Sequence, residues 1–386
     1  MTYPKTNTIP LKKYRVGVLT APVEQASVVP ISNLVEILRS ISESIVLITG
    51  NAAYEYFKCD KGVLTYDTGH PIEINPAKKI FNYIRAQFQG SLTILKNRNT
   101  VDIWFFFMGG EREILPILTA TLLRKPTLLI LTGSIVKTAR YSKDPFLLPI
   151  ILLNRVICHL VSGLVLYSAR IIPELGLDHY KKKVFIAQRH FIDPELFLCS
   201  QNYEDRSPLI GYIGRLSGEK GVLNFVESFP GIHSRDPTIR FFIGGDGALR
   251  DQIMTGISRS GLNENTTVAR WIPHDELPIY LNRLKLLVLP SYTEGLPNIL
   301  LESMACGTPV LATSVGAVPD VITEQISGFI LPDNSPLTIE ESVIHALNHP
   351  DLKKISDMGK KIIESRYGFK NAVESYAAVI SGFLPG

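Results

Sequence analysis

The sequence predicts an α/β protein built from two Rossmann-like domains, each a doubly wound parallel sheet covered by helices. In both halves of the 386-residue chain, short apolar runs alternate with segments of helical periodicity, which is typical of strands joined by crossover helices. The length suits two domains of ordinary size, and a hydrophobic content of 45% is enough for two cores. No internal repeat or low-complexity tract competes with this interpretation.

The first half is expected to supply the first sheet. Its apolar runs predict strands at Arg15–Thr20, Ile45–Thr49, Val101–Met108, Thr127–Leu131 and Val184–Ile186. Helical spacing predicts helices at Pro30–Ser40 and Arg112–Leu123. A glycine pair, Gly109 and Gly110, follows the third strand. In a parallel sheet such a loop lies at the edge where ligands bind.

The longest apolar region, Pro145–Ser168, raises the question of a membrane. A spanning helix would bury Arg155 near its centre, at a cost of about 2.5–3.5 kcal/mol on insertion scales. We therefore expect a helix ending near His159 or Leu160, a break at Ser162 and Gly163, and a buried strand at Leu164–Ser168. Basic residues lie close in sequence: Lys137, Arg140, Lys143 and Arg155. Both a plain core helix and a helix in the headgroup zone of a membrane stay open.

Charge is divided unevenly along the chain. Residues 1–190 carry 24 Lys and Arg against 13 Asp and Glu, a net charge of +11, whereas residues 191–386 carry 16 against 23, or −7. The basic first half is expected to meet an anionic partner, such as an anionic membrane or a phosphorylated molecule, unless it is a plain solvated face. Nucleic acid is not expected as a partner, because the basic residues are scattered and form no recognised binding motif.

Cysteine usage and the start of the chain indicate a reducing compartment. The four cysteines lie far apart without a C-x-x-C pair, so we expect buried thiols instead of a disulfide framework or a metal site. The first 20 residues lack the uninterrupted apolar core of a signal peptide. The expectation is a cytoplasmic protein, with the inner face of the membrane as its alternative place of action.

The most informative segment is Glu294–Glu302, EGLPNILLE, in which two carboxylates flank a Gly/Pro turn that opens a helix. The turn ends the apolar strand Leu284–Pro290 and helical spacing then begins, so Glu302 is expected in the first turn of the helix. Unpaired N–H groups at a helix start form a cradle for a diphosphate. The carboxylates are better suited to accept hydrogen bonds from hydroxyl groups, one set on a ribose and one on a hexose.

A second segment, Leu209–Gly221, supplies positive charge. It runs from an apolar strand, Leu209–Ile213, through a glycine-rich loop into a helix expected at Gly221–Phe229. Arg215 and Lys220 therefore lie near another helix start. A guanidinium fork and an ammonium group can together neutralise a nucleoside diphosphate without a metal ion. The two segments predict a nucleotide-sugar site that uses neither a metal nor a cofactor.

The second half resembles the family 4 glycosyltransferases, which are retaining, nucleotide-sugar-dependent enzymes of GT-B fold. The resemblance rests on four segments in the family's order: Gly214–Gly221, Gly244–Gly247, Val288–Thr313 and Val315–Ile322. It implies two Rossmann-like domains facing a cleft, with residues 1–195 on the acceptor side and residues 196–366 binding the nucleotide sugar. A final helix within residues 367–386 would pack back on the first domain, and the polar stretch 200–207 is expected to be the hinge.

The resemblance also implies roles for individual residues. Arg215 and Lys220 would grip the donor diphosphate, Glu302 would hold the ribose hydroxyls, and Glu294 would read the transferred sugar. Arg215, Lys220 and Glu294 are the expected catalytic residues. The donor-side residues that it implies are Gly214, Arg215, Lys220, Gly245, Trp271, Ile272, Glu294, Gly295, Leu296, Pro297, Asn298 and Glu302. Trp271 and Ile272 would lie at the edge of the nucleobase, beside Arg270, where many relatives carry glycine.

The acceptor side departs from the family's pattern. Many relatives carry a glycine pair after the first strand and a histidine near the end of a later strand, and this chain has neither. Gly109, Gly110 and His190 are the acceptor-side candidates in this sequence. A simple tight turn explains the glycines equally well, and a lone histidine is more often structural.

Together these features predict a retaining hexosyltransferase that moves a sugar from a UDP-, GDP- or ADP-sugar to a lipid-linked, polysaccharide or small-molecule acceptor. In the family, attack on the same face as the leaving diphosphate lets its oxygen accept the acceptor's proton, so a dedicated protein base is not required. Two alternatives stay open: a catalytically degenerate nucleotide-sugar-binding or scaffold subunit, and a nucleotide-sugar epimerase. A dinucleotide oxidoreductase is disfavoured, because GGDG and MGGE lack the full G-x-G-x-x-G pattern.

Overall fold

The computed structural model describes residues 14–69, 76–141, 144 and 146–384, and the chain divides into two compact units. Unit 1 takes the chain up to Phe191 together with the segment from Phe369 onward, and unit 2 is Ile192–Gly368. Lys143, Pro145 and the first 13 residues, on which expectations were placed, lie outside the described part. Each unit is an α/β fold around one parallel sheet, which confirms the predicted fold class.

Unit 1 contains a seven-stranded parallel sheet in the order β3-β2-β1-β4-β5-β6-β7. The strands are β1 (Tyr14–Val23), β2 (Ser42–Asn51), β3 (Val63–Asp67), β4 (Ile103–Phe107), β5 (Thr127–Ile130), β6 (Gly163–Leu166) and β7 (Val184–Ile186). Every residue of β4 is buried, because a central parallel strand is covered on both faces. Strand order reverses between β1 and β4, so this sheet has its topological switch point there.

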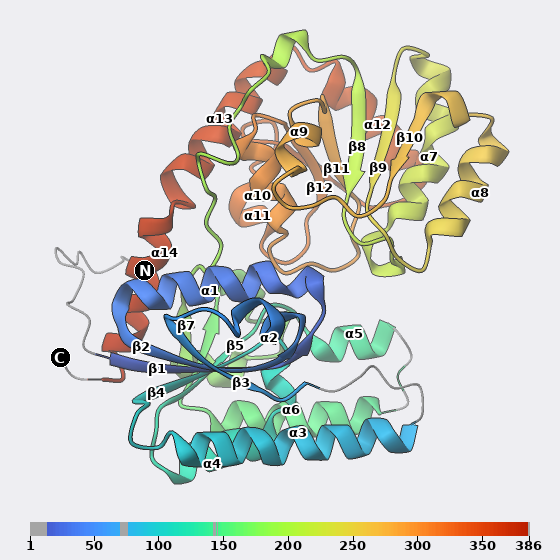
Figure 1. Cartoon of the computed structure of the whole chain (residues 1–386). Coiled ribbons are helices and arrows are strands. Elements are labelled where there is room, and N and C mark those ends of the chain that lie inside the picture. The colour runs from blue at the N-terminus through green and yellow to red at the C-terminus, as the bar shows by residue number, and fades with distance from the viewer. Residues whose placement is uncertain (1–13, 70–75, 142–143, 145, 385–386) are drawn as a thin grey trace. The chain divides into compact units, whose positions relative to one another are not determined.

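Helices cover both faces of the unit 1 sheet (Figure 1). One face carries α1 (Val28–Ile41), α2 (Ala52–Phe57) and α14 (Phe369–Ser381), and the other carries α3 (Pro76–Lys96), α4 (Ile114–Leu122) and α6 (Leu147–Leu160). A short helix, α5 (Ile135–Tyr141), precedes α6. Residues Ala372 and Tyr376 of α14 belong to the buried apolar core of unit 1, so the last helix of the chain packs within this unit.

The long apolar region forms a helix and a strand. α6 ends at Leu160, as expected, and the break lies at Val161 and Ser162, because Gly163 already pairs as the first residue of β6. Among the described residues, no helix is both long and apolar enough to cross a membrane. α6 is not a plain core helix either, because Leu148, Leu152 and Val156 are exposed while Ile157 and Cys158 are buried.

Unit 2 contains a six-stranded parallel sheet in the order β10-β9-β8-β11-β12-β13. The strands are β8 (Leu209–Ile213), β9 (Arg240–Gly244), β10 (Thr266–Ala269), β11 (Leu286–Leu289), β12 (Val310–Thr313) and β13 (Phe329–Leu331). The helices are α7 (Val222–Arg235), α8 (Arg250–Ser260), α9 (Leu277–Leu281), α10 (Asn298–Ala305), α11 (Val318–Val321), α12 (Pro336–Leu347) and α13 (Leu352–Arg366). Strand order reverses between β8 and β11, which is the switch point of this sheet.

Three expectations are corrected by the structure. Glu302 lies in the second turn of α10, because Pro297 is the N-cap and the helix begins only at Asn298. The stretch 200–207, expected as a hinge, is fixed to unit 2 by the buried Arg206, which donates to Leu284 O at 3.1 Å and to Cys306 O at 2.8 Å. The four cysteines are not all buried thiols, since two of them are exposed. The exposed pair is Cys59 and Cys199.

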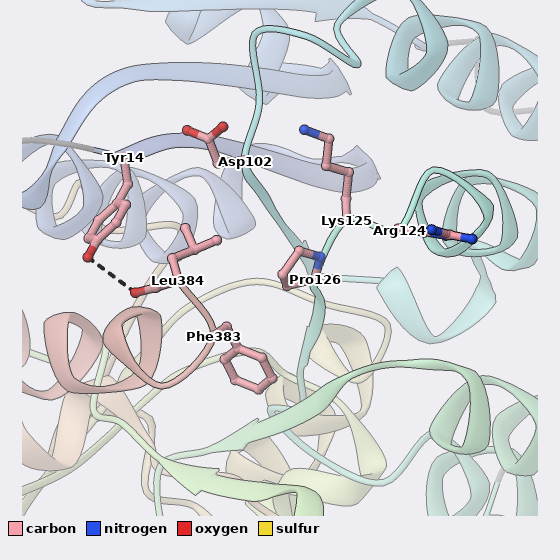
Figure 2. Close-up of a pocket in the computed structure, with 7 residues that line it drawn as sticks. All are labelled: Tyr14, Asp102, Arg124, Lys125, Pro126, Phe383 and Leu384. Carbon is pink, nitrogen blue, oxygen red and sulfur yellow. Dashed lines mark hydrogen bonds between the residues drawn. The ribbon is translucent and has the colours of Figure 1, made fainter. Parts of the chain in front are cut away.

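A pocket of about 580 Å³ lies at the amino-terminal edge of the unit 1 sheet (Figure 2). Tyr14 begins β1, and Asp102 and Pro126 directly precede β4 and β5. Tyr14 Oη donates to the carbonyl oxygen of Leu384 at 3.3 Å across it. The remaining lining residues are Arg124, Lys125 and Phe383. The pocket holds none of the residues singled out from the sequence, and it lies at the edge opposite to the one where parallel sheets bind ligands.

Glu113, at the start of α4, is a buried carboxyl group whose burial raises its pKa to about 7 from 4.5. Because the folded-state pKa exceeds the unfolded one, the neutral group contributes stability below the unfolded pKa, and this contribution is lost as pH rises through the folded pKa. We expect Glu113→Gln to raise the free energy of unfolding by about 2 to 3 kcal/mol near pH 8 and by less than about 1 kcal/mol near pH 5. Denaturant unfolding at both pH values tests this. The exposed Glu341→Gln is the control, and equal effects of Glu113→Gln at the two pH values would contradict the prediction.

Candidate functional site

The residues singled out in unit 2 gather at the carboxyl edge of its sheet. The loop Gly214–Lys220 follows β8, Gly245–Gly247 follows β9, Arg270–Ile272 follows β10 and Pro290–Asn298 follows β11. Since all these strands are parallel, the loops that follow them share one edge. The loops after β8 and β11 flank the switch point, where such sheets bind their ligands.

An ion pair joins the two loops at the switch point. Lys220 Nζ donates to Glu294 Oε1 at 2.7 Å, and the side chains are only 22% and 11% exposed. Ser291 Oγ donates to the same carboxylate oxygen at 2.8 Å. Thr313 lies at the end of β12, and its Oγ1 donates a hydrogen bond to the carbonyl oxygen of Ser291 at 2.6 Å. Within the described chain Glu294 Oε2 accepts no hydrogen bond, so this oxygen can receive a ligand hydroxyl.

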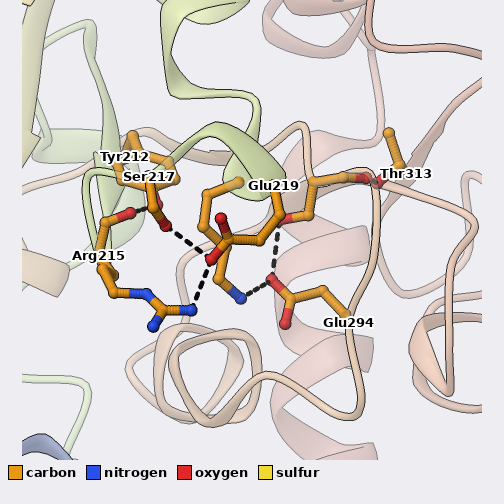
Figure 3. Close-up of polar contacts among 8 residues, drawn as sticks. Tyr212, Arg215, Ser217, Glu219, Glu294 and Thr313 are labelled. Atoms are coloured by element: carbon orange, nitrogen blue, oxygen red, sulfur yellow. Dashed lines mark hydrogen bonds and ion pairs between the residues drawn. The ribbon is translucent and has the colours of Figure 1, made fainter. Parts of the chain in front are cut away.

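Arg215 is the more exposed cation of the site, with 68% of its side chain accessible. Its guanidinium pairs with Glu219 at 2.5 Å, and Ser217 Oγ donates to the same oxygen at 2.7 Å (Figure 3). Burial raises the pKa of Glu219, but the hydrogen bond from Ser217 and the charges of Arg215 and Lys220 outweigh it and hold this pKa below its usual value. Both cations of the site therefore have carboxylate partners that an incoming diphosphate would have to displace or share.

Glycines let the loops of the site approach one another closely. Gly245 has φ +139°, and a Cβ there would lie 1.9 Å from the carbonyl oxygen of Gly214. Gly221, at φ +65° just before α7, would meet the carbonyl oxygen of Pro290 at 2.0 Å. Gly316 has φ +58°, and a Cβ there would lie 2.3 Å from the carbonyl oxygen of Gly295. Any side chain at these positions would push apart the loops that carry the charged residues.

Glu302 is buried and pairs with a histidine that the sequence did not reveal as a site residue. Its Oε1 lies 3.0 Å from His274 Nε2, and this hydrogen bond raises the pKa of His274 although burial opposes it. Glu302 Oε2 accepts no hydrogen bond from the described residues. Within that part of the chain, no hydrogen bond links this pair to Lys220 or Glu294 directly. The pair forms a second polar group on unit 2, contributed by α10 and by the segment after β10.

The start of α10 has no side-chain cap, so its first backbone N–H groups are available to an anion. Pro297 adopts φ −66° and ψ 124° as the N-cap, and no side chain caps the helix. The first N–H groups of α10 therefore have no acceptor within the helix. Leu296 is buried and anchors the turn. Among the described residues, no group of three or more His, Cys, Asp or Glu is placed to hold a metal ion.

In the segment after β10, neighbouring side chains differ in burial. Ile272 is buried against β9, where its Cδ1 lies 2.7 Å from the position a Cβ on Gly244 would take. Trp271 is exposed and offers an indole face. His274 follows on the same segment, and its closeness in sequence to Trp271 is the signal that could have marked it. Ser217, Glu219 and Ser291 were also missed, although all three lie within the loops already singled out.

In unit 1, Gly109 and Gly110 lie at the switch point between β1 and β4. Gly109 has φ +96°, and a Cβ there would lie 2.6 Å from Ala21 Cβ. A Cβ on Gly110 would lie 2.8 Å from Phe106 Cβ. The amide of Ala21 donates to Met108 O at 3.1 Å, which ties the loop to the end of β1. Packing alone thus requires both glycines, at the edge where a ligand of unit 1 would bind.

His190 is buried just after β7, next to the equally buried Arg189. Neither ring nitrogen has a hydrogen-bond partner in the described chain. Burial, followed by the charge of Arg189, holds the pKa of His190 well below 6.5, so the ring is neutral near pH 7. The Arg189 guanidinium lies 5.3 Å from the ring centre of Phe107. A neutral imidazole with both nitrogens unpaired keeps its capacity to donate and to accept one hydrogen bond.

Comparison with solved structures identifies the architecture. The chain is similar to Anabaena HepE in complex with UDP and glucose, with a TM-score of 0.76 and 13% identity over 96% of this chain and 100% of that chain. Sucrose-phosphate synthase from Thermosynechococcus elongatus gives a TM-score of 0.76 and 14% identity over 96% and 99% of the two chains. At these identities the similarity shows the fold, which is the GT-B architecture expected from the sequence.

Comparison with sequences finds a family match in unit 2. Residues 199–364 match the family described as glycosyl transferases group 1. Alpha-D-kanosaminyltransferase of Streptomyces kanamyceticus is 27% identical over 176 residues, which are 45% of this chain and 46% of that protein. The capsular polysaccharide biosynthesis glycosyltransferase CapM of Staphylococcus aureus is 26% identical over 178 residues, 46% of each chain. Residues 199–364 are therefore similar to the group 1 glycosyltransferases, and the aligned part spans less than half the length of these relatives.

Proposed function

We propose that this protein is a metal-independent, retaining glycosyltransferase of family 4 type, which moves a hexosyl unit from a nucleotide sugar to a glycan or lipid-linked acceptor. The observation that carries the proposal is the Lys220–Glu294 ion pair, which joins two loops at the switch point of the unit 2 sheet. A cation and a hydroxyl acceptor held side by side suit a ligand that has a diphosphate next to a sugar. UDP-hexoses are the first donors to test, because HepE has been solved with UDP and glucose.

Arg215 and Lys220 are proposed to bind the donor diphosphate. When the bond between the sugar C1 and the diphosphate oxygen breaks, the oxygen keeps the electron pair and negative charge develops on the leaving group. Two cations and the uncapped start of α10 stabilise that charge, and the partial burial of Lys220 strengthens its effect. The acceptor hydroxyl attacks C1 from the same face, and its proton passes to the departing diphosphate oxygen. This sequence requires no protein base.

The two carboxylates are proposed to orient the sugars of the donor. Glu294 Oε2 would accept a hydroxyl of the transferred hexose, together with backbone groups of Gly295–Asn298. Glu302 Oε2 would accept ribose hydroxyls, with its other oxygen fixed by His274. The exposed indole of Trp271 would flank the nucleobase, with Ile272 anchoring the segment. In each carboxylate one oxygen is held by the protein and the other accepts no hydrogen bond from the described chain, which is the arrangement that positioning a hydroxyl requires.

Gly109, Gly110 and His190 are proposed to lie on the acceptor side. The glycines occupy the switch point of the unit 1 sheet, and His190 follows β7 at the same carboxyl edge. A neutral histidine can hydrogen-bond an acceptor hydroxyl without adding charge. The name of CapM associates that relative with capsular polysaccharide, which makes a polysaccharide or its lipid-linked precursor the acceptor class we propose. The proposed place of action is the cytoplasm, at the inner face of the membrane.

Release of nucleoside diphosphate tests the proposal. The protein is incubated with UDP-, GDP- and ADP-hexoses without an acceptor, in the presence and absence of EDTA. We expect slow hydrolysis of one class of donor, insensitive to EDTA, with the freed sugar first appearing in the anomeric configuration of the donor. Release that EDTA abolishes would contradict metal independence. Binding without hydrolysis or transfer would indicate the scaffold alternative, and a new nucleotide sugar would indicate the epimerase.

A further inference from the structure

Helix α3 of unit 1 presents its large apolar side chains to solvent. Phe81 and Leu92 are 65% and 63% exposed. Other apolar residues of the same stripe are also exposed: Ile80, Ile84 and Phe88. These positions recur at helical spacing, so they form one continuous stripe along α3. A helix on the surface of a globular protein ordinarily has the opposite orientation, with its apolar stripe against the core.

The outward orientation of α3 is fixed by its inner face. Gln87 Nε2 donates to Glu113 Oε2 at 2.7 Å, and Gln87 Oε1 accepts from the amide of Leu115 at 3.1 Å. Gly90 lies against α4, where a Cβ would be 3.1 Å from Pro116 Cγ. Rotating α3 to bury its apolar stripe would break both hydrogen bonds and place a bulky side chain where glycine fits. The exposed stripe is therefore a property of the packed helix.

Two further helices on the same side of unit 1 also expose apolar side chains. Leu148, Leu152 and Val156 are exposed at intervals of four residues along α6, which places them on one side of it. Leu122, at the end of α4, is 83% exposed. α4 contacts both α3 and α6, and the three helices cover the same face of the unit 1 sheet (Figure 1). We call the exposed apolar residues of these helices the α3–α4–α6 surface. Large apolar side chains exposed in this number on one face of a unit indicate a binding surface.

The charges on these three helices all have one sign. Residues 76–98, 114–126 and 146–160 contain eight Lys and Arg and no Asp or Glu, and the acidic residues next to these ranges are Glu111, Glu113 and Asp144. Arg85 and Arg155 are exposed beside the apolar residues Ile84 and Val156. Long basic side chains of this kind bury their stems in an apolar layer and keep the charged group at its boundary. Apolar side chains bordered by cations match the interface of an anionic lipid bilayer.

We propose that the α3–α4–α6 surface docks unit 1 onto an anionic membrane, with α3 and α6 lying in the lipid interface. A second copy of the chain is a poorer occupant, because a twofold contact would set these cations against their own copies. Spanning is excluded for α3 by its basic residues and low apolarity. The inference rests on the proposed function in one respect: docking on the membrane would bring the enzyme to an acceptor that is attached to a lipid carrier.

Vesicle co-sedimentation of the full chain tests this inference. Phosphatidylcholine vesicles containing phosphatidylglycerol are compared with vesicles of phosphatidylcholine alone, at low and high salt. We expect binding to the anionic vesicles that weakens with salt, and a loss of about tenfold or more in the variant F81Q/F88Q/L92Q. The matched control variant, I279Q/I326Q/L337Q, changes three exposed apolar residues of unit 2. This variant should bind the vesicles as tightly as the unchanged protein does. The variant R85Q/R155Q should bind less tightly and lose part of its salt dependence.

Three outcomes decide against the inference. Either no binding by the unchanged protein, or equal binding by F81Q/F88Q/L92Q, would overturn it. A dimer in sedimentation velocity that F81Q/F88Q/L92Q dissociates would assign the surface to a second copy. Diphosphate release without vesicles is measured on the same proteins, and F81Q/F88Q/L92Q should keep it, because the changed side chains face solvent. Release without vesicle binding would refute this inference alone, whereas vesicle binding without release from any donor would refute the proposed function alone.

Discussion

The Lys220→Ala variant is expected to lose about two to three orders of magnitude in kcat while keeping its fold. Lys220 Nζ lies 2.7 Å from Glu294 Oε1 at the switch point, so the change removes the cation that contacts the carboxylate proposed to bind the transferred sugar. The charge that develops on the diphosphate is then left to the more exposed Arg215 and to the start of α10. The measurement is the rate of nucleoside diphosphate release at saturating donor, with thermal unfolding as the check on the fold.

A matched control for this variant exists on α13. Lys354 forms an exposed ion pair with Asp351 at 2.6 Å, and Lys354→Ala removes the same charge from unit 2 at a position outside the site. The control should release diphosphate at the unchanged rate, since exposed pairs of this kind contribute little. Near-normal turnover by Lys220→Ala would remove the assignment of this lysine to the diphosphate.

Glu294→Gln should lower kcat/KM by about two orders of magnitude, the second largest effect we expect. The amide keeps the shape of the side chain and can still accept from Ser291, but it loses the charge that orients Lys220 and strengthens a bond to a sugar hydroxyl. Because the two residues share one contact, their effects should not add. The double variant Lys220→Ala with Glu294→Gln should be less impaired than the product of the two single effects.

The check is to measure kcat/KM for the unchanged protein, the two single variants and the double variant. Strict additivity of the logarithms of kcat/KM would show that Lys220 and Glu294 act independently, contrary to the ion pair on which the site is built. Full activity of Glu294→Gln would show that this carboxylate does not bind the transferred sugar.

Much of the unit 2 site could be predicted from sequence because it is encoded locally. The segments around Lys220 and Glu294 each contain an apolar strand, a glycine-containing turn and a helix start, so their place at the carboxyl edge follows from chain order. Glu219 contacts Arg215 and Ser217 within the same segment and could have been found there, whereas His274 could not be predicted in the same way. The contact of His274 with Glu302 joins α10 to the segment after β10, a tertiary pairing that spacing along the chain does not specify.

Unit 1 was less predictable, for a different physical reason. The break between α6 and β6 was expected at Ser162 and Gly163, and it lies one residue earlier, at Val161 and Ser162. Helix α3 was not predicted, although apolar residues recur along it at helical spacing. What spacing could not show is that this stripe faces solvent, because contacts of Gln87 and Gly90 with α4 and the residues at its start fix the inner face. Strand β3 was also missed, since this edge strand has few buried residues.

Calorimetric titration with nucleoside diphosphates and their sugars tests the central claim most directly, which is that unit 2 binds an activated sugar by its diphosphate. The account predicts measurable heat with at least one UDP, GDP or ADP conjugate in the presence of EDTA, and an affinity at least about tenfold lower for Lys220→Ala. The absence of heat with every conjugate, or equal affinity of the unchanged protein and Lys220→Ala, would contradict it.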